Sequence, residues 1–271
     1  MTDHLWSINS GTLVGTFPDR VAAMKEAGFP AATLWHSDLF PLFDDPDGSI
    51  MSFRNSGLKL SAYQLLRDYE GMPADVQRRK LDIARQQIGQ IKLVGGDMLV
   101  LGSTMSPADR NDWKGAVASI RALGDLAKSE GVRIGYEPMC FSEWINDYRL
   151  GWKLIKEVDH SHVGMVLDTA HIFLPGHPLD GISDIPGDKI FLAEINDFAQ
   201  SRLPIREQLR NYRLFPGEGV QPVREYVDRI LATGYRGHFA IEVFNATYRT
   251  FDAKAVAKRA YASMEKLFAK K

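Results

Sequence analysis

The sequence predicts an α/β fold of the (β/α)8 TIM-barrel class, and three observations lead to this prediction. The chain has 271 residues, and one such barrel typically needs about 250. Apolar runs of strand character alternate with helical segments along the whole chain, without a break in composition. Four of these runs end in an acid, and four strand ends converge only if the strands are parallel and wrapped into a ring. We therefore expect residues 1–271 to form a single barrel domain.

The first half of the chain contains four predicted strands and three predicted helices. Proline in its first turn and glycine after its last turn favour the first helix. The Asp-, Pro- and Gly-rich segment 44–48 predicts a turn. The predicted strands are 5–8, 31–35, 58–65 and 98–101, and the predicted helices are 18–28, 74–94 and 112–130.

The second half repeats this alternation. Its predicted strands are 133–137, 164–168, 190–194 and 238–243, and its predicted helices are 148–158, 222–233 and 253–269. Asn146 or Asp147 is the expected N-cap of the helix at 148–158. The strand that ends at Asp168 precedes a Pro- and Gly-rich loop with a short helix near Ile182, and a long polar loop runs from Glu194 through Gly219.

Composition excludes several classes of protein. A net charge of −1 argues against nucleic-acid binding and against binding to an acidic membrane surface. Cys140 is the only cysteine, which excludes an internal disulfide and a thiolate-rich zinc site. No apolar run is long enough for a transmembrane helix, and the N-terminus lacks the pattern of a secretory signal. We expect a cytoplasmic protein. An open doubly wound sheet is disfavoured, because no Gly-x-Gly-x-x-Gly turn follows the first strand.

The four strand-end acids are candidate metal ligands. They are Glu137, Asp168, Glu194 and Glu242. In a TIM barrel the active site lies at the carboxyl ends of the strands, where crowded carboxylates stay ionised only beside a cation. Oxygen ligands favour Mg²⁺ or Mn²⁺ over Zn²⁺. The alternative is that some of these acids pair with arginines at the rim of the barrel.

Other polar residues near strand ends are candidate substrate contacts. His171 follows Asp168 by three residues and would contact the substrate or move a proton. Arg67 follows a strand end and would bind a substrate carboxylate, unless it pairs with a neighbouring acid. Arg149 is either a substrate contact or part of a helix start. Tyr212 belongs to the long loop, whose length indicates a function.

Several motifs make the chain similar to the xylose-isomerase-like TIM-barrel superfamily of sugar isomerases and epimerases. Within this superfamily the sequence most resembles bacterial 3-dehydroshikimate dehydratases. The motifs that carry the resemblance extend over nearly the whole chain. They are Ser10-Gly-Thr-Leu, Arg67-Asp-Tyr-Glu-Gly-Met72, Tyr136-Glu137, Asn146-Asp-Tyr-Arg149, Val166-Leu-Asp-Thr-Ala-His171, Ile185-Pro-Gly-Asp-Lys-Ile-Phe191, Asn211-Tyr-Arg-Leu-Phe-Pro-Gly217 and Ile241-Glu-Val-Phe-Asn245.

The resemblance implies a lyase that converts 3-dehydroshikimate to protocatechuate and water through a metal-stabilised enolate. It implies one divalent cation, Mg²⁺, Mn²⁺ or Co²⁺, on the four acids. The resemblance also places Arg67 and His171 toward the substrate. Together with the analysis of the residues, this makes Glu137, His171 and Glu242 the candidate catalytic residues and Arg67, Arg149, His36 and Tyr212 the candidate substrate contacts. The substrate would be a small polyhydroxylated ketone. Homo-oligomers are common among such barrels, and the number of subunits is left open.

Two departures from the dehydratase pattern leave the substrate open. Glu194 stands where dehydratases carry glutamine and many epimerases carry histidine, and it adds a negative charge to the site. His36 lies in Trp35-His-Ser-Asp38, where the family tends to have Phe-Glu-Asn-Asp. The alternative function is therefore a metal-dependent isomerase or epimerase of a keto-sugar or polyol, with Glu137 and Glu242 as opposed acid and base. A DNA-repair endonuclease on the same barrel is disfavoured, because only His171 lies at a motif position.

Overall fold

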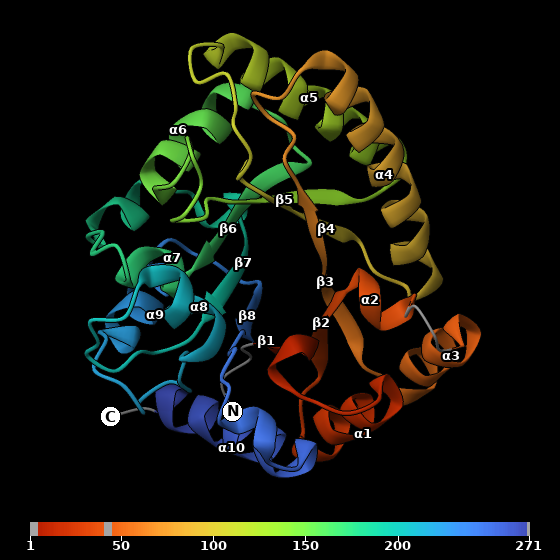
Figure 1. The fold of residues 1–271 in the computed structure, drawn as a ribbon, viewed down its shortest axis with the longest axis vertical. Coiled ribbons are helices and arrows are strands. Elements are labelled where there is room, and N and C mark those ends of the chain that lie inside the picture. The colour runs from red at the N-terminus through yellow and green to blue at the C-terminus, as the bar shows by residue number, and fades with distance from the viewer. Residues whose placement is uncertain (1–4, 41–44, 270–271) are drawn as a thin grey trace.

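Eight parallel strands close into a barrel in the order of the sequence, as the sequence predicts. The structure is a computed structural model and describes residues 5–40 and 45–269. Figure 1 shows the strands as a central ring with most helices outside it. The strands are β1 (Leu5–Asn9), β2 (Ala31–Trp35), β3 (Lys59–Arg67), β4 (Met98–Gly102), β5 (Arg133–Glu137), β6 (Val163–Asp168), β7 (Ile190–Ile195) and β8 (His238–Ile241).

Helices connect each strand to the next parallel strand. The helices are α1 (Phe17–Ala27), α2 (His36–Leu39), α3 (Pro46–Ser56), α4 (Ala74–Leu93), α5 (Trp113–Ser129), α6 (Tyr148–Val158), α7 (Thr169–Phe173), α8 (Ile205–Asn211), α9 (Val223–Ala232) and α10 (Ala253–Phe268). The barrel closes where β1 pairs with β8, and outside the barrel α10 packs on α1. Figure 1 shows α10 beside α1 at the same edge of the molecule.

Alternation along the strands separates two cores. Successive side chains of a strand point to opposite faces. Val166, Leu192 and Ala240 each precede one of the acids by two residues, and they belong to a small apolar cluster that fills the barrel. Their sequence neighbours Leu167 and Ala193 belong instead to the large core between the barrel and the helices. The acids therefore share the inward direction of the first set.

Helix ends follow the capping residues that the sequence predicts. Asp147 accepts the backbone N–H of Arg149 and is the N-cap of α6, which decides between the two expected caps. Gly28 ends α1 with a φ of 101°, a left-handed conformation in which glycine carries no steric penalty. The short helix near Ile182 is a 3-10 helix, Asp180–Asp184.

The predicted turn at 44–48 is wrong for its described part. Residue 44 lies outside the described residues, but Pro46 to Gly48 form the first turn of α3. Asp45 caps this helix by accepting the N–H of Asp47, and a proline at the start needs no intrahelical donor. The Asp and Pro residues that suggested a turn are thus the start signal of a helix. The short helices α7 and α8 also lie in segments predicted as loops.

In the part of the chain that the structure describes, the search for membrane spans finds no helix with the length and apolar character that crossing a bilayer requires.

Candidate metal centre

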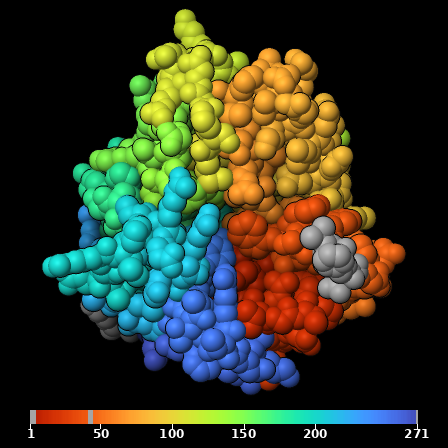
Figure 2. All heavy atoms as spheres, in the orientation of Figure 1, coloured from red at the N-terminus to blue at the C-terminus, as the bar shows by residue number. Residues whose placement is uncertain are grey.

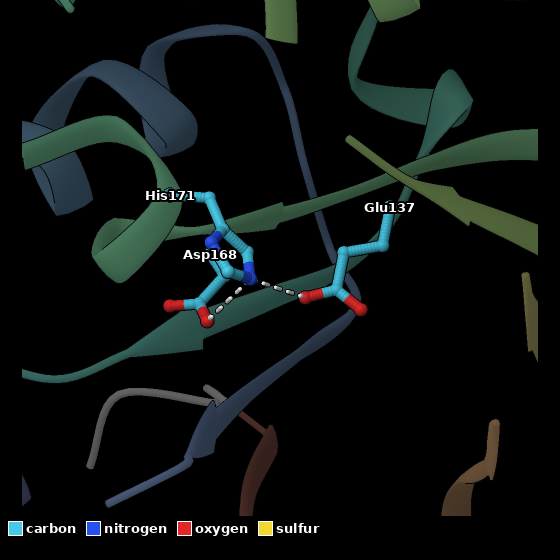
Figure 3. A group of neighbouring side chains, drawn as sticks. All are labelled: Glu137, Asp168 and His171. Atoms are coloured by element: carbon cyan, nitrogen blue, oxygen red, sulfur yellow. Dashed lines mark ion pairs between the residues drawn. The ribbon is translucent and has the colours of Figure 1, made fainter. Parts of the chain in front are cut away.

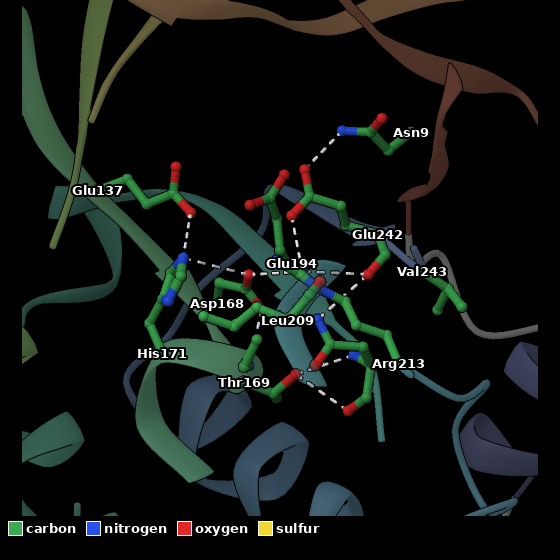
Figure 4. Close-up of polar contacts among 12 residues, drawn as sticks. Asn9, Glu137, Asp168, Thr169, His171, Glu194, Leu209, Arg213, Glu242 and Val243 are labelled. Carbon is green, nitrogen blue, oxygen red and sulfur yellow. Dashed lines mark hydrogen bonds and ion pairs between the residues drawn. The ribbon is translucent and has the colours of Figure 1, made fainter. Parts of the chain in front are cut away.

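The four predicted acids converge at the carboxyl ends of β5, β6, β7 and β8. Each offers one carboxylate oxygen, and these oxygens lie within 4.8 Å of one another. Asp168 and Glu194 are direct partners in the register of β6 and β7, and Glu242 follows the last residue of β8. All four side chains are buried, with residue exposures between 0% and 3%. We call Glu137, Asp168, Glu194 and Glu242 the acid cluster (Figure 4).

Arg213 supplies the positive charge nearest to the acid cluster. Its Nη1 donates to Oδ2 of Asp168 at 2.9 Å and to Oε2 of Glu242 at 2.8 Å. Its Nε donates to the backbone oxygen of Leu209 at 2.9 Å, and its guanidinium lies 4.7 Å from the ring centre of Phe244. Arg213 is 4% exposed, so this ion pair is largely protected from solvent.

Amide side chains hold the carboxylates in fixed positions. Asn9 donates to Oε1 of Glu242 at 2.7 Å, and Gln64 donates to Oε1 of Glu194 at 3.1 Å. Asn196 donates to Oδ1 of Asp168 at 2.7 Å. These bonds fix the cluster before any ligand enters, which is a condition for a well-defined site.

Burial and mutual repulsion shift the titration of the acid cluster. The pKa of Glu194 is raised well above its ordinary value by burial and by the charges of Glu242, Glu137 and Asp168. Burial also raises the pKa of Glu242, to about 8, although Arg213 opposes the shift. Burial acts in the same direction on Asp168, but Arg213 and His171 outweigh it and lower its pKa. The acid cluster therefore carries more carboxylates than its protein partners can keep ionised.

His171 stands beside the acid cluster, in the middle of the short helix α7 that follows β6. Its Nε2 lies 3.5 Å from Oε1 of Glu137 and 3.9 Å from Oδ2 of Asp168 (Figure 3). Its Nδ1 lies 3.3 Å from Sγ of Cys140. Burial disfavours the imidazolium, but the hydrogen bonds with Cys140 and Glu137 and the charge of Asp168 prevail and raise the pKa of His171 to about 10. His171 is therefore a proton donor at neutral pH.

The acid cluster fits a divalent cation. Oε2 of Glu194 is buried and has no hydrogen-bond partner among the described residues. An unpartnered carboxylate oxygen inside a protein is costly, and a cation would satisfy it. The carboxylate donor set is the one preferred by Mg²⁺ and Mn²⁺.

A cavity of about 290 Å³ opens onto the acid cluster. Its wall combines aromatic and apolar side chains with two of the acids, His171 and four arginines. The residues that line it are Trp35, Gln64, Leu65, Arg67, Met105, Glu137, Met139, Phe141, His171, Arg206, Leu209, Arg210, Arg213, Glu242 and Phe244. This size suits a small molecule, near the lower end of about 300–1,000 Å³ for ligand pockets.

The structure brings only some of the predicted substrate contacts to this cavity. Arg67, at the end of β3, lies in its wall, and no neighbouring acid within the described chain pairs with it. Nδ1 of His36 lies 3.0 Å from Oε1 of Gln90, and its ring stacks on that of Phe40. His36 is not among the residues that line the cavity. Arg149 pairs with Asp147 at the start of α6, so of its two expected roles it has the one at the helix start.

Tyr212 also lies outside the lining set. It ends α8, is 47% exposed and forms an isolated antiparallel bridge with Asn245. Its neighbour Arg213 enters the site instead. The motif Asn211-Tyr-Arg contains both residues, but the sequence does not indicate which of the two side chains points into the site.

Sequence reasoning also missed two groups of site residues. Arg206 and Arg210 line the cavity from α8, a helix that lies within a segment predicted as a polar loop. The amides Asn9, Gln64 and Asn196 bind the acids. The inward direction of Asn9 and Gln64 follows from the alternation of side chains along a strand. Asn196 follows the expected acid Glu194 by two residues, and this spacing was the available signal.

Comparisons with known proteins agree with this fold. The family model described as xylose isomerase-like TIM barrel matches residues 21–267. A 3-dehydroshikimate dehydratase of Pseudomonas putida is 33% identical over 244 residues, which cover 90% of this chain and 38% of that protein.

Solved structures give the same picture of the fold. A xylose isomerase-like TIM barrel/4-hydroxyphenylpyruvate dioxygenase fusion protein superimposes with a TM-score of 0.92 at 30% identity, over 97% of this chain and 42% of that chain. The IOLI protein with a binding zinc atom superimposes with a TM-score of 0.83 at 20% identity, over 97% of both chains. The present chain spans about two fifths of the length of the dehydratase and of the fusion protein.

Proposed function

This chain belongs to the xylose isomerase-like TIM barrel family, and on that premise we propose that it is a divalent-metal-dependent dehydratase that converts 3-dehydroshikimate to protocatechuate and water. The observation that carries the proposal is the acid cluster at the base of a cavity with arginines in its wall. The similarity to the dehydratase of Pseudomonas putida supports it.

The four carboxylates of the acid cluster would hold the cation, as Mg²⁺ or Mn²⁺. The bound cation would polarise the substrate ketone and favour the negative charge that develops when a neighbouring proton leaves. Asn9, Gln64 and Asn196 keep the three carboxylates that they contact in place. Their hydrogen bonds reduce the reorganisation that the reaction requires.

Proton transfer falls to acidic and basic side chains that line the cavity. Glu137 and Glu242 reach the cavity from β5 and β8, and either carboxylate can accept the proton next to the ketone. The hydrogen bonds with Cys140 and Glu137 favour the protonated form of His171, which would deliver a proton to the departing hydroxyl group, so that it leaves as water. One proton is removed and one is delivered in this elimination, and a further shift of a ring proton to the former ketone oxygen gives the aromatic product. Arg67 would contact the substrate carboxylate.

A second candidate function rests on the placement of Glu137 and Glu242. Figure 4 shows these carboxylates on either side of Glu194, an arrangement that suits an acid and a base acting on two faces of a keto-sugar. An isomerase or epimerase of this kind would use the same cation and would not need Arg67.

The test is turnover of 3-dehydroshikimate by Mn²⁺-loaded protein, followed through the absorbance of protocatechuate. We expect turnover that disappears after chelation and in Glu137→Gln. The matched control is Glu143→Gln, which changes an exposed acid paired with Arg110 in the loop after β5 and should keep full activity. Absence of turnover in protein with bound Mn²⁺ would contradict the dehydratase proposal, and turnover of a neutral keto-sugar would establish the second candidate.

A further inference from the structure

Three arginines in the cavity wall have no acidic partner among the described residues. Arg67 lies at the end of β3, and Arg206 and Arg210 lie on α8. No carboxylate of the described residues forms an ion pair with any of them, whereas the fourth arginine of the wall, Arg213, is bound to Asp168 and Glu242. Unpaired guanidinium groups beside a cavity attract an anion.

The two arginines of α8 form a pair. They are four residues apart, so they lie on the same side of the helix. The buried Leu209 holds α8 against the protein, because it belongs to an apolar cluster with Ala170 and Phe198. In Figure 2 the cyan spheres of the segment that contains α8 cover the left of the visible face, between green residues above and blue residues below.

The ring of Phe141 contacts both Arg206 and His171. The guanidinium of Arg206 lies 5.6 Å from the ring centre of Phe141, and the ring of Phe141 lies 5.5 Å from that of His171. All three residues line the cavity. Arg206 and His171 are therefore linked along the cavity wall by contacts with a single aromatic side chain.

We propose that Arg206 and Arg210 are an anion clamp that selects substrates with a carboxylate or phosphate at the end remote from the reacting ketone. The inference rests on the active site of the proposed function and assigns to α8, in addition to Arg67, the recognition of the anionic group of its substrate. Both arginines of the anion clamp line the cavity, whereas Glu194 does not. A neutral keto-sugar would leave the clamp unused.

The test measures binding rather than turnover. Calorimetry of Mn²⁺-loaded protein compares shikimate with its methyl ester, and D-fructose 6-phosphate with D-fructose. We expect at least one charged ligand to bind at least about tenfold more tightly than its neutral partner. A preference within the first pair assigns the clamp to carboxylates, and a preference within the second assigns it to phosphates.

The variant Arg206→Gln/Arg210→Gln should abolish this preference while its Mn²⁺ affinity stays unchanged, because neither arginine contacts the acid cluster. The matched control is Arg78→Gln/Arg202→Gln, which removes the same charge from two exposed arginines outside the cavity. The single variant Arg67→Gln removes only the arginine at the end of β3. A preference for anions that persists in this variant is therefore due to the anion clamp.

Equal binding of charged and neutral partners by the unmodified protein would overturn the inference. Failure of every charged ligand to bind, or a preference that survives in Arg206→Gln/Arg210→Gln, would overturn it as well. A protein that prefers anions but does not turn over 3-dehydroshikimate would keep the anion clamp and lose the proposed function. A protein that turns over 3-dehydroshikimate but shows no preference for anions would support the proposed function and contradict the anion clamp.

Discussion

Nη1 of Arg213 lies 2.9 Å from Oδ2 of Asp168, so a guanidinium group of the protein holds a carboxylate that is also a candidate cation ligand. The same nitrogen lies 2.8 Å from Oε2 of Glu242. Arg213 therefore neutralises part of the acid cluster whether or not a cation is present. The stability of the metal-free protein should depend strongly on it.

Replacing Arg213 should destabilise the metal-free protein more than the metal-loaded one. Arg213→Gln leaves two buried carboxylates without their cationic partner, and the loss of one member of a buried pair costs about 3–5 kcal/mol. A bound cation would offset part of this loss, because it neutralises the same carboxylates. Urea unfolding with and without Mn²⁺ measures both values. An equal loss of unfolding free energy under both conditions would show that Arg213 and the cation act on separate charges.

Replacing Glu194 should have opposite effects on folding and on metal binding. Its raised pKa means that the folded protein disfavours the ionised form above pH 4.5, and this cost increases as the pH rises. Glu194→Gln removes the cost and keeps an oxygen for Gln64, so the metal-free protein should melt at a higher temperature at pH 8. Its Mn²⁺ affinity should fall at least about tenfold. The exposed Glu265→Gln is the control, and unchanged Mn²⁺ affinity in Glu194→Gln would remove Glu194 from the ligand set.

The acid cluster could be predicted from the sequence because it depends on simple geometry. Each acid ends an apolar run, parallel strands bring their carboxyl ends together, and side chains alternate in direction along a strand. Asp168 and Glu194 meet in the register of two neighbouring strands for this reason alone. His171 follows from the same argument, since the α7 turn starts directly at the end of β6.

The residues on long connections could not be predicted in the same way. Arg213 reaches the acid cluster because tertiary contacts fix its backbone: its N–H and its oxygen bond to Phe244 and Asn245. Arg206 and Arg210 depend on the short helix α8, which carries no strong start or end signal in the sequence. Tyr212 was chosen for its place in a long loop and His36 for its departure from the family pattern, and neither lies in the cavity wall.

Glu70 should make stability depend on pH. This acid is fully buried behind β5, and its Oε1 accepts the backbone N–H of Thr104 and the hydroxyl of Tyr136, both near 2.8 Å. Burial raises the pKa of Glu70 from 4.5 to about 7. The unfolded chain therefore binds fewer protons than the folded one in this interval, and stability falls as the pH rises through it.

The size of the Glu70 effect is on the order of 3 kcal/mol between pH 4.5 and pH 7, because one pKa unit corresponds to about 1.36 kcal/mol. Glu70→Gln should flatten this part of the pH profile of the unfolding free energy, with little change below pH 4. The comparison uses urea unfolding of both proteins at matched pH values. Parallel profiles for the two proteins would contradict the assignment.

Asp197 should stabilise the conformation of the segment that carries α8 and Arg213. Its carboxylate accepts four backbone N–H groups, at distances between 2.7 and 3.0 Å. The donors are Phe198, Gly217, Gly219 and Gln221. Asp197→Asn places an amide N–H₂ against some of these donors and should cost about 1–3 kcal/mol.

The readout for Asp197→Asn is hydrogen exchange, which should accelerate at residues 217–221 and stay unchanged in β4 and β5, far along the ring. Exchange that accelerates evenly over the chain would indicate a general loss of stability, and unchanged exchange would mean that the carboxylate does not hold the segment.

The measurement that tests the central claim most directly is a calorimetric titration of chelator-treated protein with Mn²⁺. The account predicts one bound ion per chain and at least about a tenfold loss of affinity in Asp168→Asn, whose isosteric amide keeps the shape of the site but removes a charged ligand. The exposed Asp125→Asn should bind the ion like the unmodified protein. Failure to bind Mn²⁺, or equal affinity in Asp168→Asn, would contradict a metal centre formed by the acid cluster.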